Sequence, residues 1–390
     1  MSRHHSYINT AKTITGQYKG EEPFAIFLKQ FFANNKKYGS KDRKQIGSLC
    51  YHYYRVVNAL SHQESEEKFL AATLLCEHRF SDLLEVIRPE WNQIITQSAA
   101  EKMGVLKNDF DETKLFPFSD ELSGGLDARA FAASFLHQPK LFLRLRPGHE
   151  KMVMAKLNAI AVPFKQVNNY CLALANGTQI DEEIAIDKEA VVQDYNSQQA
   201  GEVIRPFLTN TPSPITIWDC CAASGGKSIM LYDIDTSIRL TVSDIRPSIL
   251  HNLDNRFKRA GLHNYHSFVA DLTAGAAKLP ASQKFNFIIA DVPCSGSGTW
   301  ARTPEQLYFF KRELIDEFAK RQQKIVRHII PYLVSGGHLV YITCSVFKKE
   351  NEAIVKYMEE KHALQLVEMK LLKGYDSYAD TMFVAILKKV

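Results

Sequence analysis

Two of the seven cysteines stand where a reactive thiol would be expected, directly after strand-like runs of the chain. Cys294 closes the stretch DVPC, and Cys344 is the middle residue of the stretch TCS, 50 positions further on. The carboxyl ends of neighbouring strands in a doubly wound sheet meet at one crevice, so both thiols are predicted to face one substrate. A lone cysteine is usually an inert apolar side chain, as we expect for Cys50 and Cys76 in their apolar helical runs. The pair at one crevice favours thiolate chemistry.

Four strand-like runs end in an acid, at Asp219, Asp244, Asp271 and Asp291. A single acid at such a place would more often cap a helix or bond within its own loop. Four of them, ordered strand by strand at the ligand-binding edge of a parallel sheet, favour a binding site. Asp244 is placed to grip ribose hydroxyls, and Asp271 to meet an adenine edge.

The stretch CCAASGGKS (220–228) resembles the end of a nucleotide-triphosphate loop but lacks its first glycine. A phosphate loop needs that glycine five positions before Gly226, and Cys221 stands there. What remains is a strand ending in an acid, then small residues and two glycines that open a helix, so a ligand could approach the backbone closely. The predicted ligand is an adenosine without phosphates, which S-adenosyl-L-methionine fits and ATP does not.

Thiols beside such a cofactor indicate methyl transfer to a pyrimidine carbon. C5 of cytosine is a weak nucleophile, and addition of a thiolate to C6 activates it by covalent catalysis. A base must then remove the C5 proton so that the thiolate can leave, while an acid near N3 supports the ring. Methylation of an exocyclic amine needs no thiol and commonly uses an Asp/Asn-Pro-Pro-aromatic loop. The loop DVPC at 291–294 therefore favours carbon over nitrogen.

The elements that must position these residues follow a strand–helix–strand order from about residue 206. Strands are predicted at 215–219, 240–244, 267–271, 285–291, 337–344 and 381–389, with helices at 247–260 and 311–333. This alternation predicts an α/β fold with a mostly parallel, doubly wound sheet. Residues 1–138 carry apolar residues at helical spacing and are predicted to form an all-α domain. A connecting α/β subdomain is expected at 139–205, and the catalytic domain at 206–390.

Composition excludes several classes of protein. The chain has 390 residues, a net charge of +5, seven irregularly spaced cysteines and no C-x-x-C pair. These features predict neither a disulfide framework nor a metal site, and the absence of a long apolar run predicts no membrane contact. We expect a monomer in the reducing cytoplasm. Ten Lys/Arg against three Asp/Glu between Arg3 and Arg55 either attract a polyanion such as RNA or form a solvated helical surface.

The motifs together resemble the RsmB/NSUN family of RNA 5-methylcytosine methyltransferases. The resemblance covers about residues 140–390 and is carried by DCCAASGGKS (219–228), SDIRPS (243–248), DVPCSGSGTWARTPE (291–305) and VYITCSVFKKENE (340–352). It implies the class I, Rossmann-like methyltransferase fold. The stretch KDRKQIGSLCYHYYRVV (41–57) also resembles the NusB-like RNA-binding domain of the RsmB branch, which implies a ribosomal RNA substrate.

The resemblance implies a role for each matching residue. Cys344 would be the nucleophile on C6, Cys294 would assist release of the methylated base, and Asp291 would lie between cofactor and base. Asp244 would take the ribose and Asp271 the adenine side. The methionine part of the cofactor would lie on the loop formed by Cys221, Ala222, Ala223, Ser224, Gly225, Gly226 and Lys227.

Some positions depart from the family pattern or stay open. Ser224 stands where the family usually has proline, Ile342 replaces a common serine, and Ala301 replaces a common arginine, but no proposed catalytic group is lost. Lys227 is expected either near the target base or a phosphate, or as a solvated lysine at a helix start. The sequence thus predicts methylation of cytosine C5 in RNA, with 16S ribosomal RNA as the expected substrate. A transfer-RNA substrate and a non-catalytic RNA-binding assembly factor are the alternatives.

Overall fold

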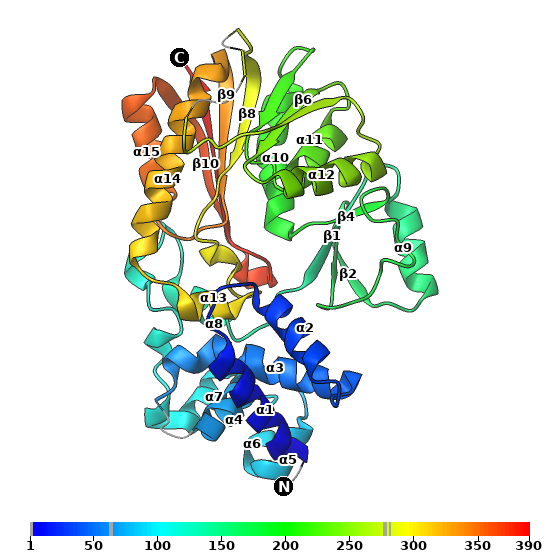
Figure 1. Ribbon diagram of the computed structural model, residues 1–390, viewed down its shortest axis with the longest axis vertical. Coiled ribbons are helices and arrows are strands. Elements are labelled where there is room, and N and C mark those ends of the chain that lie inside the picture. The colour runs from blue at the N-terminus through cyan, green and yellow to red at the C-terminus, as the bar shows by residue number, and fades with distance from the viewer. Residues whose placement is uncertain (1–2, 62–64, 276–278, 281) are drawn as a thin grey trace. The chain divides into compact units, whose positions relative to one another are not determined.

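The computed structural model describes residues 3–61, 65–275, 279–280 and 282–390, which divide into two compact units. The first unit contains residues up to 120, residues 127–138 and residues 299–311. The second contains residues 121–126, 139–298 and 312–390. Each unit is described by itself, and Figure 1 shows the elements of both.

The first unit is helical, as predicted for the N-terminal part of the chain. Its helices are α1 (Arg3–Gln17), α2 (Phe24–Asn34), α3 (Ser40–Val56), α4 (Ser65–Cys76), α5 (Asp82–Ile87), α6 (Pro89–Asn92), α7 (Ala99–Leu106), α8 (Ala128–Ser134) and α13 (Pro304–Phe309). The last of these comes from the segment after the DVPC loop, whose Trp300 is fully buried and packs against Phe116. A sequence division at residue 138 did not anticipate that this distant segment completes the helical core.

The connecting segment forms a small antiparallel sheet within the second unit. Its strands are β1 (Leu141–Leu145), β2 (Phe164–Asn168), β3 (Cys171–Leu174) and β4 (Ala190–Val192), in the order β2-β3-β1-β4, with α9 (Glu150–Ala159) between β1 and β2. Buried Arg144 and Arg146 pair with Asp233 at 2.5 and 2.6 Å. These ion pairs tie the sheet to the helix that follows the cofactor loop.

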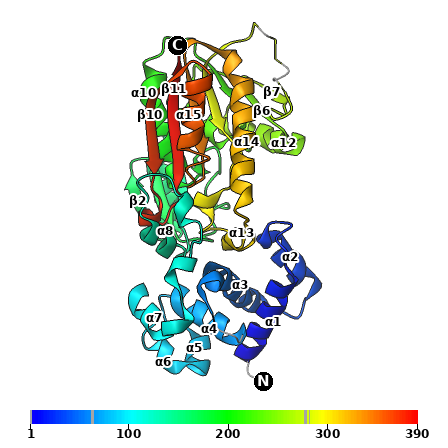
Figure 2. The same ribbon diagram turned by 90° about the vertical axis from the view of Figure 1, so that its left-hand side faces the viewer.

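The second unit is built around a seven-stranded sheet in the order β10-β11-β9-β8-β5-β6-β7. Strands β5 (Thr216–Asp219), β6 (Arg239–Asp244), β7 (Tyr265–Val269), β8 (Phe285–Asp291) and β9 (Leu333–Thr343) pair in parallel. Strands β10 (Leu364–Leu372) and β11 (Met382–Lys389) pair antiparallel, and Figure 2 labels both. The mostly parallel, doubly wound fold is thereby confirmed.

Two details of the predicted sheet were wrong. The third strand ends at Val269, so Asp271 lies in the turn after it rather than at its tip. Strand β10 was not predicted at all, because this edge strand is only partly buried and carries charged residues among its apolar ones.

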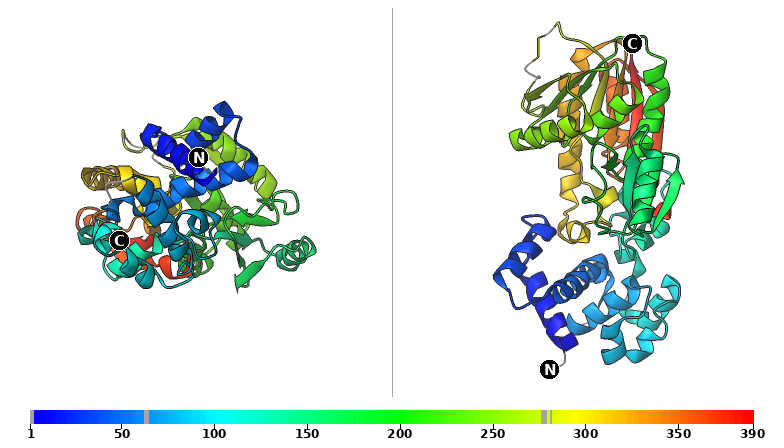
Figure 3. Two further views of the ribbon diagram at one scale, coloured as in Figure 1. Left: turned by 90° about the horizontal axis from the view of Figure 1, so that it is seen from below. Right: turned by 90° about the vertical axis from the view of Figure 1, so that its right-hand side faces the viewer.

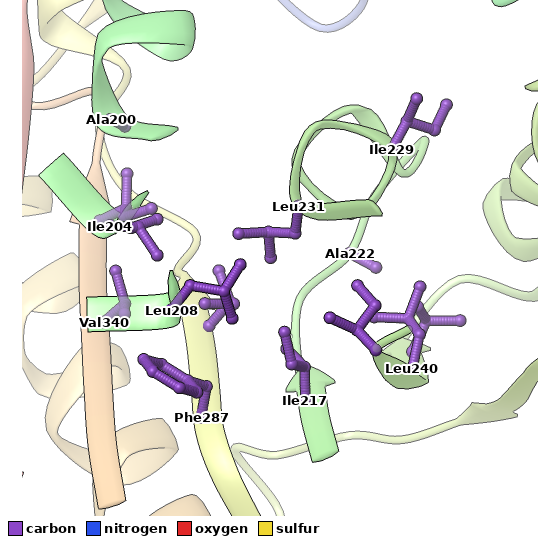
Figure 4. Packing of buried hydrophobic residues seen from close by; sticks show 14 of the residues in the cluster. Ala200, Ile204, Leu208, Ile217, Ala222, Ile229, Leu231, Leu240, Phe287 and Val340 are labelled. Atoms are coloured by element: carbon purple, nitrogen blue, oxygen red, sulfur yellow. The ribbon is translucent and has the colours of Figure 1, made fainter. Parts of the chain in front are cut away.

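Apolar side chains cover both faces of the sheet, which is why its strands read as nearly continuous apolar runs. On one face Ile217 and Leu240 pack under α10 (Tyr195–Thr209), α11 (Gly226–Ile234) and α12 (Pro247–Ala260), as Figure 4 shows in part. On the other face Trp218 and Ile288 belong to a cluster with residues of α14 (Glu313–Ile329) and α15 (Glu352–Lys361). Figure 3 shows these layers from two further sides.

Helix α12 shows how local sequence sets an element beside the site. Pro247 is its first residue, Gly261 ends it with a φ of 74°, and Lys258 and Arg259 lie in its last turn. Proline suits the first turn, glycine the left-handed end, and cations the carboxyl end of a helix. Its bounds are those predicted from the sequence.

Candidate active site

A cavity of ≈ 600 Å³ opens at the carboxyl ends of the parallel strands, where the sequence predicted the ligand crevice. It is lined by residues from five strand ends, among them Cys221, Asp244, Asp271, Asp291, Cys294 and Cys344. Acidic oxygens and apolar groups such as Ala270, Val292 and Ile325 share its wall. Carboxylates can accept hydrogen bonds from ribose hydroxyls and attract a sulfonium cation, so this lining suits an adenosyl group that carries a sulfonium. Three carboxylates would repel the phosphates of ATP.

The loop between β5 and α11 turns tightly along the cavity. Ala223 has a φ of 46° and Gly225 a φ of 80°. A Cβ atom on Gly225 would lie 2.4 Å from the ring of Phe257, so glycine is required there by both backbone and packing. Ser224, the departure from the family's proline, accepts hydrogen bonds from Arg256 at 2.8 Å to its hydroxyl and 3.0 Å to its carbonyl. The bond to the hydroxyl gives the loop a support that proline, which has only its carbonyl as an acceptor, would not provide.

The two acids assigned to the adenosine occupy different surroundings. Asp244 is buried, and its Oδ2 accepts a hydrogen bond from the Ala223 amide at 3.1 Å, which joins the β6 end to the cofactor loop. Asp271 is exposed and accepts bonds from the Thr273 amide and hydroxyl, which lower its pKa. Both line the cavity, Asp271 from the turn after β7.

Asp219 lies beneath the cofactor loop and is 1% exposed. Its Oδ2 accepts a bond from Ser228 at 2.7 Å, whereas Oδ1 has no hydrogen-bond partner among the described residues. Burial raises the pKa of this carboxyl to about 7, with nearby Asp291 adding to the effect. Its position at a strand end was recognised from sequence, but its burial depends on the packed fold.

Lys227 and Asp291 form an ion pair inside the site. The Lys227 ammonium lies 2.6 Å from Asp291 Oδ2, and the lysine is only 9% exposed. Burial is the largest single influence and opposes the charge on Lys227, but the attraction and the hydrogen bond of Asp291, together with nearby Asp219, outweigh burial and raise the pKa of the lysine. The alternative of a solvated lysine at a helix start was therefore wrong. The pair places a cation beside the carboxylate that lines the cavity at the end of β8.

The two candidate thiols meet at the ends of β8 and β9. Cys294 Sγ and Cys344 Sγ are 3.3 Å apart, and both residues are half-buried. The pKa of Cys294 is raised well above its usual value, chiefly by the hydrogen bond with Cys344 and by burial. Cys294 therefore keeps its proton, and the contact brings both sulfurs to one point of the cavity wall.

The remaining cysteines are placed apart from this contact. Cys50, Cys76, Cys171 and Cys220 are buried, which confirms Cys50 and Cys76 as core residues. Cys220 belongs to the apolar cluster under α14.

Residues that sequence reasoning missed also border the cavity. Arg246 lines it and pairs with Asp244 at 3.1 Å, and Arg321 reaches it from α14. Arg246 could have been found from its place in SDIRPS, two positions after Asp244. Arg321 gives no such signal, since it lies on a long amphipathic helix whose face toward the cavity is set by packing. Across the described part of the chain, no three His, Cys, Asp or Glu residues are grouped to hold a metal ion.

Residues 208–384 match the family model for the 16S rRNA methyltransferase RsmB/F. This stretch, 177 of the 390 residues, is similar to the RsmB/F methyltransferase family. The chain is 33% identical over 203 residues to Ribosomal RNA small subunit methyltransferase B of Proteus mirabilis, covering 51% of this chain and 46% of that protein. The same protein of Shewanella oneidensis is 32% identical over 170 residues, covering 43% of this chain and 37% of the relative. The chain thus spans less than half the length of either relative.

Solved structures agree with the RsmB/F assignment at the level of fold. The crystal structure of PH0851 matches with a TM-score of 0.71 at 17% identity and covers 100% of this chain and 99% of that one. NSun6 from Pyrococcus horikoshii, solved with SFG, matches with a TM-score of 0.58 at 15% identity over 70% of this chain and 97% of that one. The domain is of the S-adenosyl-L-methionine-dependent class, which confirms the predicted cofactor. Within the described ranges, no helix is long and apolar enough to cross a bilayer.

Proposed function

We propose that the protein methylates C5 of a cytosine in RNA, and that small-subunit ribosomal RNA is the substrate. The observation that carries the proposal is the contact of the two thiols, 3.3 Å apart, in the wall of the cofactor cavity. An amine methyltransferase has no use for either sulfur, whereas a pyrimidine C5 methyltransferase needs a nucleophile for C6 and a group that assists release. The names of the RsmB relatives support ribosomal RNA as the substrate.

Cys344 and the Lys227–Asp291 pair have different parts in the proposed reaction. Cys344 Sγ adds to C6 as a thiolate, while the Lys227–Asp291 pair holds a proton near N3 as negative charge develops on the ring. Bound S-adenosyl-L-methionine supplies an electrophilic methyl group. The C5 proton then leaves to a base and the bond between Cys344 and C6 breaks.

Cys294 assists this release. Once Cys344 is bonded to carbon, its sulfur no longer holds the Cys294 proton, and the largest cause of the raised Cys294 pKa is lost. Cys294 can then lose its proton to solvent and receive the one from C5.

The helical unit is proposed to bind RNA. Ten of its residues between Arg3 and Arg55 are basic, against three acids, and Lys36, Lys37, Lys41 and Lys44 are exposed. Exposed lysines at this density attract the phosphate backbone without reading its sequence. Arg55 is an exception, because it is 2% exposed and donates to the Phe135 carbonyl.

The function is tested by incubating the protein with labelled cofactor and either small-subunit ribosomal RNA or transfer RNA, followed by nucleoside analysis. The proposal predicts label in 5-methylcytosine from ribosomal RNA, and none with Cys344→Ala. Label in transfer RNA alone would show that transfer RNA, not ribosomal RNA, is the substrate. Label in an N-methylated base would refute methylation at C5.

A further inference from the structure

The loops that carry the two cysteines are joined beneath the cavity by one buried carboxylate, that of Glu350. This side chain is 0% exposed, and it lies in the turn between β9 and α15. Its Oε1 accepts a hydrogen bond from Ser345 Oγ at 2.7 Å, and its Oε2 accepts one from the Ser295 amide at 2.9 Å. Ser345 directly follows Cys344, and Ser295 directly follows Cys294. Each carboxylate oxygen therefore holds the residue beside one of the thiols.

Further bonds make the same connection. Gln322, buried on α14, donates through Nε2 both to Glu350 Oε2 at 2.9 Å and to the Pro293 carbonyl at 3.1 Å. Pro293 immediately precedes Cys294, so the DVPC loop is held on both sides of its cysteine. The hydroxyls of Ser295 and Ser345 are themselves 3.1 Å apart.

Burying an ionised carboxylate costs free energy, so the position of Glu350 requires an explanation. Burial raises the pKa of Glu350, and the bonds from Ser295 and Ser345 oppose that rise. Apolar packing could fill the same volume at lower cost, but it would leave the Ser295 amide without an acceptor and would not fix the distance between the loops. Bonds to a charged acceptor are short and directional, which suits a fixed spacing.

We propose that Glu350 is a positioning residue, which sets the spacing of Cys294 and Cys344 that the release step requires. The inference rests on the proposed function, because the release step is part of that function. The spacing of the two thiols itself can be tested without RNA. Glu350 is not among the residues that line the cavity, so it acts through the two serine-bearing loops and through its charge, which contributes to the raised pKa of Cys294.

Phenylarsine oxide, which bridges two thiols that lie close together, reports the spacing. The rate of bridging is followed by intact mass, and the bridged peptides are mapped to confirm Cys294 and Cys344. Glu350→Ala should slow bridging about tenfold, the factor that corresponds to loss of roughly one charged hydrogen bond. Glu350→Gln should bridge at nearly the wild-type rate, because an amide can accept from the Ser295 amide and donate to Ser345 once the hydroxyls reorient.

Glu352→Ala is the matched control. This acid lies two positions further on and accepts from Ser123 Oγ at 2.9 Å and the Gly124 amide at 3.0 Å, not from a cysteine loop. In the Glu352→Ala variant, phenylarsine oxide should bridge the two thiols at the wild-type rate. Equal rates for Glu350→Ala and wild type would overturn the proposal, as would equal losses in the Glu350→Ala and Glu352→Ala variants. If Glu350→Ala does not fold, Ser345→Ala replaces it, and an unchanged rate there has the same meaning.

A second readout separates this inference from the proposed function. In single turnover on RNA, Glu350→Ala should form the covalent adduct but release it about tenfold more slowly, and Glu350→Gln should restore release. Equal slowing of both steps would contradict a role in spacing. Absence of methyl transfer in every variant would refute the proposed function, while the arsenical result would still decide the position of Glu350.

Discussion

At the scale of the residue, the fold opposes the charge of the Asp219 carboxyl. Asp219 is buried under the cofactor loop with its pKa raised to about 7, so it is largely neutral in the folded protein below that pH. In the unfolded chain the same group ionises near pH 4. The folded state therefore binds more protons between these values, and stability contributed here is lost as pH rises toward 7.

Asp219→Asn should remove this pH dependence, because asparagine resembles the neutral acid at every pH. Between pH 5 and 8 the stability of the variant should rise relative to wild type by on the order of 3 kcal/mol. Unfolding followed by fluorescence at several pH values measures the difference. Asp271→Asn is the control, because hydrogen bonds lower the pKa of that exposed acid and leave it ionised throughout this range. A difference between Asp219→Asn and wild type that does not change with pH would contradict the account.

The location of a single residue in the site could be predicted from sequence where its place at the end of a strand determines that location. The acids and both thiols were found this way, because parallel strands end at a common edge. The partner of Lys227 could not, since 64 positions separate it from Asp291 and only the packed sheet brings them together. The same is true of Glu350, whose role depends on two loops that meet only in the fold.

At the scale of the element, the turn from β5 into α11 decides whether the cofactor can be held. Gly225 has a positive φ and faces Phe257, while its neighbour Gly226 begins the helix, where an added Cβ would approach only Arg256, at 4.0 Å, among the described residues. Two adjacent glycines thus have different reasons to be glycine. The first serves the fold, whereas the second meets no such packing constraint, and the family resemblance places the methionine part of the cofactor beside it.

Gly225→Ala should destabilise the protein by about 2 kcal/mol through backbone strain and the clash with Phe257. Gly226→Ala should unfold like wild type but bind the cofactor more weakly, because its methyl group occupies space that the ligand needs. Thermal unfolding without ligand and calorimetric titration with S-adenosyl-L-methionine separate the effects. Equal stability of the two variants would refute the claim that only Gly225 is required by the fold.

Elements were predictable where both ends carry local signals. Helix α12 has proline at its start and glycine after its end, and its predicted and observed bounds agree. Strand β10 has no such signals, and its pairing with β11 is what makes it a strand.

At the scale of the whole molecule, the chain assigns chemistry and RNA attraction to different units. The residues proposed to act in catalysis lie in the second unit, and the exposed lysines of α3 and of the segment before it lie in the first. Because residues 299–311 also belong to the first unit, removal of residues 1–138 would uncover buried Trp300. Surface substitutions test the assignment more cleanly than a deletion.

Replacement of Lys36, Lys37, Lys41 and Lys44 by alanine should weaken RNA binding and leave cofactor affinity unchanged. If all four contact phosphates, the slope of log K against log salt should fall by about 3 to 4, since each contact contributes roughly 0.7 to 0.9. Filter binding across salt concentrations provides the slope. Alanine at the exposed Lys356 and Lys361 of α15 is the control and should change neither quantity. Unchanged RNA binding in the fourfold variant would refute an RNA-binding role for this surface.

The central claim is that the Cys344 sulfur becomes bonded to a pyrimidine and that Cys294 is needed to break that bond. It is tested by incubating Cys294→Ala, Cys344→Ala and wild type with ribosomal RNA and cofactor, then separating the products on denaturing gels. We predict an RNase-sensitive protein–RNA adduct that accumulates with Cys294→Ala and is absent with Cys344→Ala. An adduct with Cys344→Ala, or none with Cys294→Ala when wild type methylates the same RNA, would contradict the assignment.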